Sequence, residues 1–93
     1  MSESPTPSED IQREIKSFQG IVDEALEIYK TRYPEFQSMW TRFPINELYL
    51  YTIIKLRRSS EFYKQGNYKK AREDYLDSLN IMLFVGSMMK EVE

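Results

Sequence analysis

Apolar residues recur at alternating intervals of four and three residues through the first third of the chain, and this spacing constrains the fold more than any other feature. The series is Ile11, Ile15, Phe18, Val22, Ala25 and Tyr29. Because an α-helix turns once every 3.6 residues, this spacing places all six side chains on one helix face. Tyr33 precedes Pro34, which disfavours a helical conformation there, so we expect a first helix near residues 9–32.

Two further helices are expected, near residues 45–65 and 68–89. Gly66 supplies a left-handed residue that ends a helix, and Asn67 can cap the next one, so the two helices form an antiparallel hairpin. Their expected core faces are Ile45, Tyr49, Ile53, Leu56 and Tyr63 in one helix, and Tyr68, Ala71, Tyr75, Leu79, Met82 and Met89 in the other. No stretch shows the alternation typical of a strand, so the sequence predicts an all-α three-helix bundle.

The connector between the first and second helices is rich in aromatic residues. Its large side chains are Tyr33, Phe36, Met39, Trp40 and Phe43. A short fourth helix can form over residues 34–43, since proline is tolerated in a first helical turn. The aromatic side chains either plug the end of the bundle or anchor a partner, and we favour the plug because a small domain needs its large side chains in the core.

Length and composition fit one small globular domain. The chain has 93 residues, of which 41% are apolar and 30% charged. We expect a single helical-bundle domain over residues 8–93. Residues 1–7 contain two prolines and no apolar residue after Met1, and we expect them to be a disordered tail.

Cysteine and histidine are both absent from the sequence. Their absence excludes a thiolate nucleophile, a disulfide and cysteine-ligated zinc, together with the commonest acid–base group and metal ligand. Acidic pairs such as Asp74 and Asp77 share a helix face, but without histidine we interpret them as solvated side chains. We therefore expect no enzyme activity, no cofactor and no metal site.

The longest apolar run, over residues 81–85, is far too short to span a bilayer. A cysteine-free chain also fits a reducing compartment. We expect a cytoplasmic protein that does not associate with membranes.

The expected hairpin carries one recognisable motif. Its residues are Ser59, Phe62, Tyr63, Gly66, Asn67, Tyr68, Ala71, Tyr75, Ser78 and Leu79. The stretch resembles a single tetratricopeptide-repeat hairpin, and it is also similar to the hairpin of the microtubule-interacting-and-trafficking domain, although there the hairpin opens the domain. A small archaeal family of unknown function ends in a similar hairpin, and that resemblance implies a compact helical bundle with no known activity.

Basic residues gather around Gly66. Residues 55–72 contain seven Lys and Arg and one Glu, a net charge of +6 within a chain of net charge -2. We define the basic tip as Lys64, Lys69, Lys70 and Arg72, the candidate anion-binding residues. They either bind nucleic acid through phosphate contacts or stay solvated and paired with acids of this chain, and we favour the second interpretation.

The run over residues 81–85 is apolar on every side of a helix, because at about 100° per residue five residues cover every quadrant. A three-helix bundle buries only part of that circumference, so the connector, a second copy or a partner has to cover the rest. The candidate interface residues are Leu83, Phe84, Met88 and Trp40. The first hypothesis is a non-catalytic helical protein–protein interaction module that forms a homodimer or binds a helical partner. The alternative is a nucleic-acid-binding accessory protein that uses the basic tip.

Overall fold

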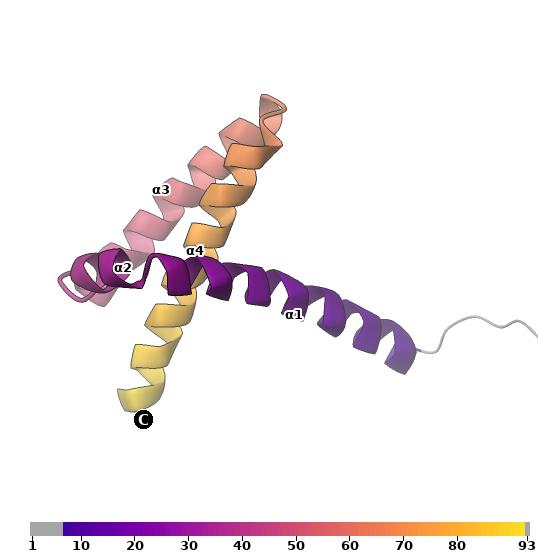
Figure 1. The fold of residues 1–93 in the computed structure, drawn as a ribbon, viewed down its shortest axis with the longest axis horizontal. Helices are drawn as coiled ribbons and strands as arrows, with labels where there is room; N and C mark the ends of the chain where they lie inside the picture. The colour runs from indigo at the N-terminus through magenta and orange to yellow at the C-terminus, as the bar shows by residue number, and fades with distance from the viewer. Residues whose placement is uncertain (1–6, 93) are drawn as a thin grey trace, which may run out of the picture.

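A computed structural model describes residues 7–92 and the side chains of residues 7–90 (Figure 1). The helices of this part of the chain are α1 (Pro7–Thr31), α2 (Tyr33–Trp40), α3 (Ile45–Lys64) and α4 (Tyr68–Val92), and it contains no strand. The predicted all-α fold and the fourth helix in the connector are confirmed. Of the predicted tail, residues 1–6 lie outside the described residues, and Pro7 already belongs to α1.

The turn between α3 and α4 forms as its local sequence requires. Gly66 has a φ of 78°, a conformation that costs little only for glycine. The Gly66 N–H donates to the Tyr63 carbonyl at 3.0 Å, and the Asn67 N–H donates to the Phe62 carbonyl at 2.8 Å, which closes the end of α3. The chain therefore reverses within three residues, and the predicted antiparallel hairpin is confirmed.

Small and polar side chains hold α3 and α4 close together. The Ser59 hydroxyl donates to the Ala71 carbonyl at 2.6 Å, and Ala71 is itself buried. Further along, Thr52 of α3 and Ser78 of α4 are buried, each with its hydroxyl bonded to a carbonyl of its own helix. Such residues let two helix backbones approach without leaving an unpaired polar group in the interface.

The apolar core lies at the other end of the hairpin, where α2 packs against α3 and α4. Its fully buried members are Phe36, Trp40, Leu48, Ile81 and Val85. The Phe36 and Trp40 rings stack with centroids 4.4 Å apart, and the Trp40 ring lies 5.5 Å from that of Phe84. The interpretation of these two connector aromatics as a core plug is therefore confirmed.

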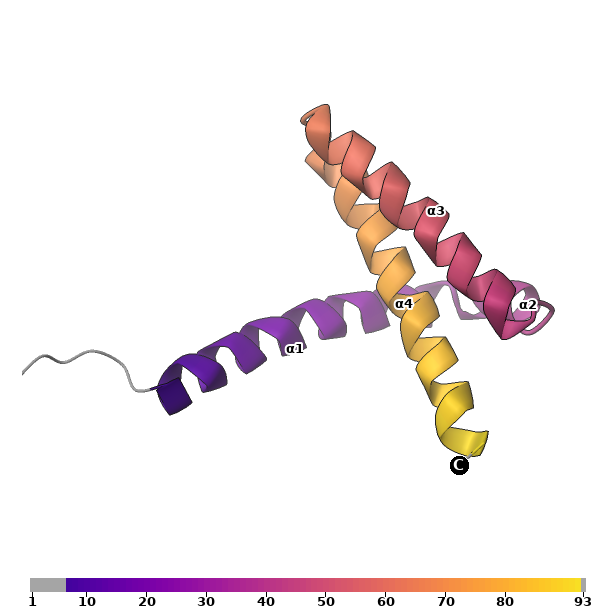
Figure 2. The same ribbon diagram turned by 180° about the vertical axis from the view of Figure 1, so that it is seen from behind.

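Helix α1 crosses α4 instead of running along the hairpin (Figures 1 and 2). Its C-terminal half packs against α4 through Ala25, which is fully buried, and Tyr29. Residues 11–20 are all exposed, so the N-terminal half of α1 projects beyond the hairpin. The radius of gyration is 16.5 Å, whereas a compact domain of this length has one of about 12 Å. The predicted apolar series on α1 is thus buried over only half its length.

Candidate protein-interaction surface

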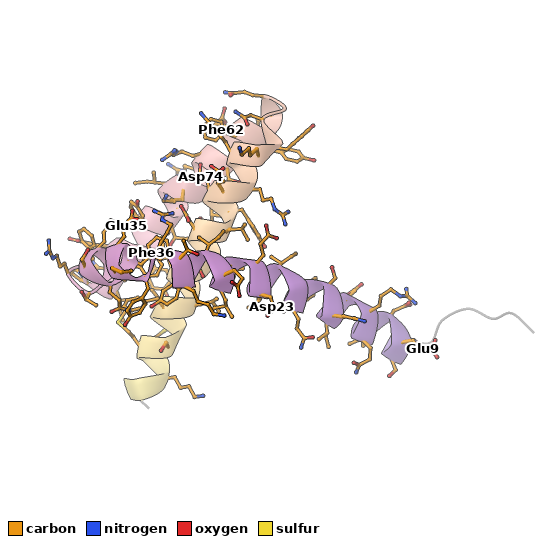
Figure 3. The ribbon with its side chains drawn as sticks, viewed as in Figure 1. Glu9, Asp23, Glu35, Phe36, Phe62 and Asp74 are labelled. Carbon is orange, nitrogen blue, oxygen red and sulfur yellow. The ribbon has the colours of Figure 1, made fainter. Side chains whose placement is uncertain are left out.

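A cluster of charged side chains lies between α3 and α4, and it is structural. Lys55 Nζ lies 3.0 Å from Asp77 Oδ2 and 4.0 Å from Asp74 Oδ1, with all three side chains largely buried. Arg58 Nε approaches Asp74 Oδ2 at 3.5 Å. The interpretation of Asp74 and Asp77 as solvated is therefore wrong, because the register of the hairpin brings Lys55 against both. Figure 3 shows Asp74 directed into this region between the two helices.

The same cluster extends to the junction of α1 and α2 through Arg32. Arg32 Nη1 lies 3.4 Å from Asp77 Oδ1, and Arg32 Nη2 lies 2.9 Å from Glu35 Oε1. The hydrogen bond and charge of the guanidinium hold the pKa of Glu35 below its usual range. Every one of these carboxylates has a cation beside it, and the described residues contain no group of His, Cys, Asp or Glu suited to a metal ion.

The interface residues predicted from the sequence are not brought together on one open surface. Trp40 is 2% exposed, and Phe84 and Met88 are partly buried against the core. Leu83 is 41% exposed, but it lies beside a small hollow at the α1–α4 crossing. The prediction of Trp40 as an open interface residue is wrong, because its ring packs against Phe36 and Phe84 in the core. An interface at Leu83, Phe84 and Met88 stays a prediction.

A broad exposed apolar surface lies elsewhere, along one side of the α3–α4 hairpin. We call it the hairpin face, and it consists of Tyr49, Ile53, Leu56 and Tyr63 of α3 with Tyr68 and Tyr75 of α4. The sequence predicted all six as core residues, yet they are exposed because no helix of the described chain packs on this side. The prediction of their burial is wrong, although the apolar pattern that identified them is correct.

The hairpin face has a groove at the end nearest the Gly66 turn. A shallow groove of about 440 Å³ runs between the two helices there, and it is lined by Ser59, Tyr63, Tyr68, Ala71, Arg72 and Tyr75. The rings of Tyr63 and Tyr68 meet edge to face with centroids 5.1 Å apart and form one wall. The small side chains of Ser59 and Ala71 form the floor, so the groove is shaped to accept side chains from an added helix.

A second unpartnered apolar surface lies on the projecting part of α1. We call residues 7–20 the overhang, and Ile11, Ile15 and Phe18 form its apolar stripe. These three side chains continue the face that carries Ala25 and Tyr29, but nothing in the described chain covers them. In Figure 3 the side chains of α1 from Asp23 to Glu9 stand clear of the other helices, whereas Phe36 lies among crowded side chains.

The basic tip is partly neutralised by acids of the same chain. Arg72 forms an ion pair with Glu24 of α1, and this contact raises the pKa of Arg72. Lys64 lies 3.5 Å from Glu61 Oε1, and Lys70 lies over the ring of Phe62. Within the described residues Lys69 has no ion-pair partner. These contacts agree with the favoured interpretation that the tip pairs largely with the chain's own groups.

A further apolar hollow, of about 350 Å³, opens between α2 and α3. Leu50 and Ile54 line its outer edge, and Trp40 and Leu48 form its base. It lies on the opposite side of α3 from Tyr63, since at about 100° per residue Leu50 and Ile54 fall roughly 140° and 180° around the helix axis from Tyr63. Leu50 in this hollow therefore provides a control position for substitutions in the hairpin face.

Comparisons with protein-family models, with curated proteins and with solved structures give no match to this chain. Within the described residues, no helix has both the length and the apolar composition required to cross a bilayer.

Proposed function

We propose that this chain is a non-catalytic protein–protein interaction module that binds an amphipathic helix on its hairpin face. The observation that carries the proposal is the exposure of six large apolar side chains, from 41 to 65%, along one side of a helical hairpin. Monomeric proteins rarely expose an apolar surface of this extent, and such surfaces usually mark binding sites.

The shape of the hairpin face favours a helix over other partners. Two antiparallel helices leave a groove between them, and a third helix fills such a groove by placing side chains at every third or fourth position into it. The groove walls are tyrosines, which combine a large apolar ring with a polar hydroxyl and are enriched at interfaces for that reason. Arg72 lies at the groove edge and pairs there with Glu24 of α1, so a carboxylate on the flank of an added helix can share this cation.

Nucleic-acid binding at the basic tip is the alternative proposal. It is supported by the net charge of +6 over residues 55–72, and it is weakened by the ion pairs that Arg72 and Lys64 make within the chain. A cytoplasmic setting is also part of the proposal, and the cysteine-free composition supports it.

The test uses a fluorescent amphipathic peptide with leucine at every third or fourth position and acidic residues along one flank. It is titrated into the Phe18→Glu chain, in which the overhang cannot compete for the groove, while fluorescence anisotropy is recorded. We expect micromolar binding that Tyr75→Glu abolishes and that Leu50→Glu, on the opposite side of α3, leaves unchanged. Absence of binding, or binding indifferent to Tyr75→Glu, would contradict the proposal.

The nucleic-acid alternative is tested separately by gel shift at low salt with single-stranded and duplex DNA and RNA. If the basic tip binds them, replacing Lys64, Lys69 and Lys70 with Ser removes a salt-dependent shift. A gel shift of nucleic acid by the native chain, combined with no peptide binding, would favour nucleic-acid binding over the interaction module.

A further inference from the structure

We propose that the helix bound by the hairpin face is the overhang of a second copy of this chain, so that two copies form a reciprocal dimer. Each overhang then lies on the partner's hairpin face, and the two sites are related by a two-fold axis. The inference rests on the proposed function, because it names the occupant of the same surface.

The two surfaces match in length and spacing. Ile11, Ile15 and Phe18 form a stripe of three side chains on one face of α1, about 10 Å long at 1.5 Å per residue. The groove end of the hairpin face, from Leu56 to Tyr63 on α3, spans seven residue steps and is therefore also about 10 Å long. The overhang thus supplies the intervals of four and three residues that a groove between two helices requires.

The exposed area is that of a stable dimer. The stripe and the groove end of the hairpin face (Leu56, Tyr63, Tyr68 and Tyr75) together contain seven large apolar side chains with exposed fractions from 40 to 65%. At roughly 150–250 Å² for each large side chain, half exposed, they present on the order of 700 Å² per copy. A specific interface of standard size buries about 800 Å² on each partner. Because both surfaces lie on every copy, the reciprocal arrangement covers the stripe and the groove end at once.

The charges of the two surfaces are also complementary. The overhang, residues 7–20, contains three acids and two basic residues, a net charge of -1, whereas the hairpin end over residues 55–72 carries +6. Asp10 and Glu14 lie four residues apart and therefore on a single flank of the overhang. Within one chain Glu24 already pairs with Arg72 beside the groove, so the basic edge of the groove accepts the acidic flank of α1.

The overhang cannot reach the hairpin face of its own chain while α1 remains one helix. Ala25 is fixed against α4 on the side of Asn80, whose amide donates to the Ala25 carbonyl at 2.9 Å. The hairpin face carries Tyr75, which lies on a different side of α4. An unbroken helix of 25 residues, from Pro7 to Thr31, continues straight past the edge of α4, as Figure 2 shows. A second copy supplies a stripe that can approach the face from outside.

Sedimentation equilibrium at micromolar concentration tests the dimer with full-length chains. We expect the native chain to have twice the mass of one chain, and Phe18→Glu and Tyr75→Glu each to weaken dimerisation by at least about a hundredfold, because each places a charge at the centre of an apolar contact. Leu50→Glu, the control, places the same charge in the hollow between α2 and α3 and leaves the mass unchanged. All three substituted side chains are exposed, and the fluorescence of buried Trp40 verifies that each variant is folded.

Mixing the two defective variants tests the reciprocal geometry. A mixed dimer of Phe18→Glu and Tyr75→Glu has both damaged surfaces at one site and an intact overhang on an intact hairpin face at the other. We expect the mixture to recover dimer that neither variant forms alone. An interface between two overhangs gives a different result, since Tyr75→Glu then dimerises normally and mixing restores nothing.

The failure of this inference is distinguishable from that of the proposed function. A monomeric native chain at high micromolar concentration overturns the second-copy inference, while peptide binding to the Phe18→Glu chain still supports a helix-binding hairpin face. A dimer that is disrupted by Leu50→Glu and not by Tyr75→Glu overturns the inference by locating the interface on the opposite side of α3.

Discussion

The side-chain amide of Asn80 donates a hydrogen bond to the backbone carbonyl of Ala25 across 2.9 Å, at the point where α1 crosses α4. Asn80 is 2% exposed and Ala25 is fully buried. The absence of a larger side chain at Ala25 lets the two helices approach closely enough for this bond. The pair therefore fixes where α1 crosses the hairpin, and with it the direction in which the overhang projects.

We predict that Asn80→Ala destabilises the chain by about 1–2 kcal/mol, because it removes a buried hydrogen bond and leaves space between α1 and α4. Asn46→Ala is the matched control, since Asn46 is exposed on α3 and makes no side-chain hydrogen bond within the described residues. We expect that substitution to change the free energy of unfolding by less than about 0.5 kcal/mol. Urea unfolding followed by Trp40 fluorescence measures both, and equal effects would contradict a locking role for Asn80.

Gly66 and Gly20 are predicted to respond in opposite ways to alanine. Gly66 has a φ of 78°, so Gly66→Ala costs roughly 1–2 kcal/mol of left-handed strain even though open space surrounds it. Gly20 lies within α1, and a Cβ placed there meets nothing within 4 Å. Gly20→Ala therefore stabilises the helical state of α1 by up to about 1 kcal/mol. Thermal unfolding followed by circular dichroism measures both, and stabilisation by Gly66→Ala would contradict the assigned turn.

The sequence predicted those features of the fold that depend on neighbouring residues. Gly66 and Asn67 mark the hairpin turn because a left-handed residue and a helix cap are local requirements. Pro34 lies in the first turn of α2, and Trp40 follows within the same short helix, so the sequence also predicted the connector plug. Each of these predictions needed only a few consecutive residues and the conformations they favour.

The sequence does not determine how α1 packs against the hairpin. Apolar periodicity identifies which face of a helix avoids water, but it does not say which neighbour covers that face or over what length. Phe18 and Tyr63 were therefore predicted as core residues, and both are exposed. The contact between Lys55 and Asp77 was missed for a related reason, since residues 22 positions apart meet only when the register of two helices is known.

The ion pair between Arg32 and Glu35 predicts a small dependence of stability on pH. The guanidinium lowers the pKa of Glu35 relative to the unfolded chain, where the pKa of glutamate is about 4.3. The pair therefore contributes its stability fully above that pH, and the contribution is lost as the pH falls through the lowered pKa of the folded state. Glu35→Gln removes this contribution, so the stability difference between the two chains should shrink on acidification. A difference that grows as the pH falls would contradict the assignment.

The last prediction concerns Lys55, whose ammonium group is the shared cation of Asp74 and Asp77. Lys55→Met keeps much of the apolar stem but leaves two carboxylates largely buried, with only Arg58 and Arg32 at 3.5 and 3.4 Å. Removing one partner of a buried ion pair typically costs 3–5 kcal/mol, and with these two cations still present we expect a loss of about 3 kcal/mol. Lys64→Met is the control, because the Lys64–Glu61 pair is exposed, and we expect it to cost less than about 1 kcal/mol.

A double-mutant cycle separates the charge effect from lost packing. Asp77→Asn removes one of the two carboxylates, so Lys55→Met should cost less in that background than in the native chain. The coupling free energy from urea unfolding of the four chains measures the interaction between Lys55 and Asp77. A coupling near zero would mean that the Lys55 stem stabilises the hairpin through packing alone, and that the ion pair does not hold α3 and α4 in register.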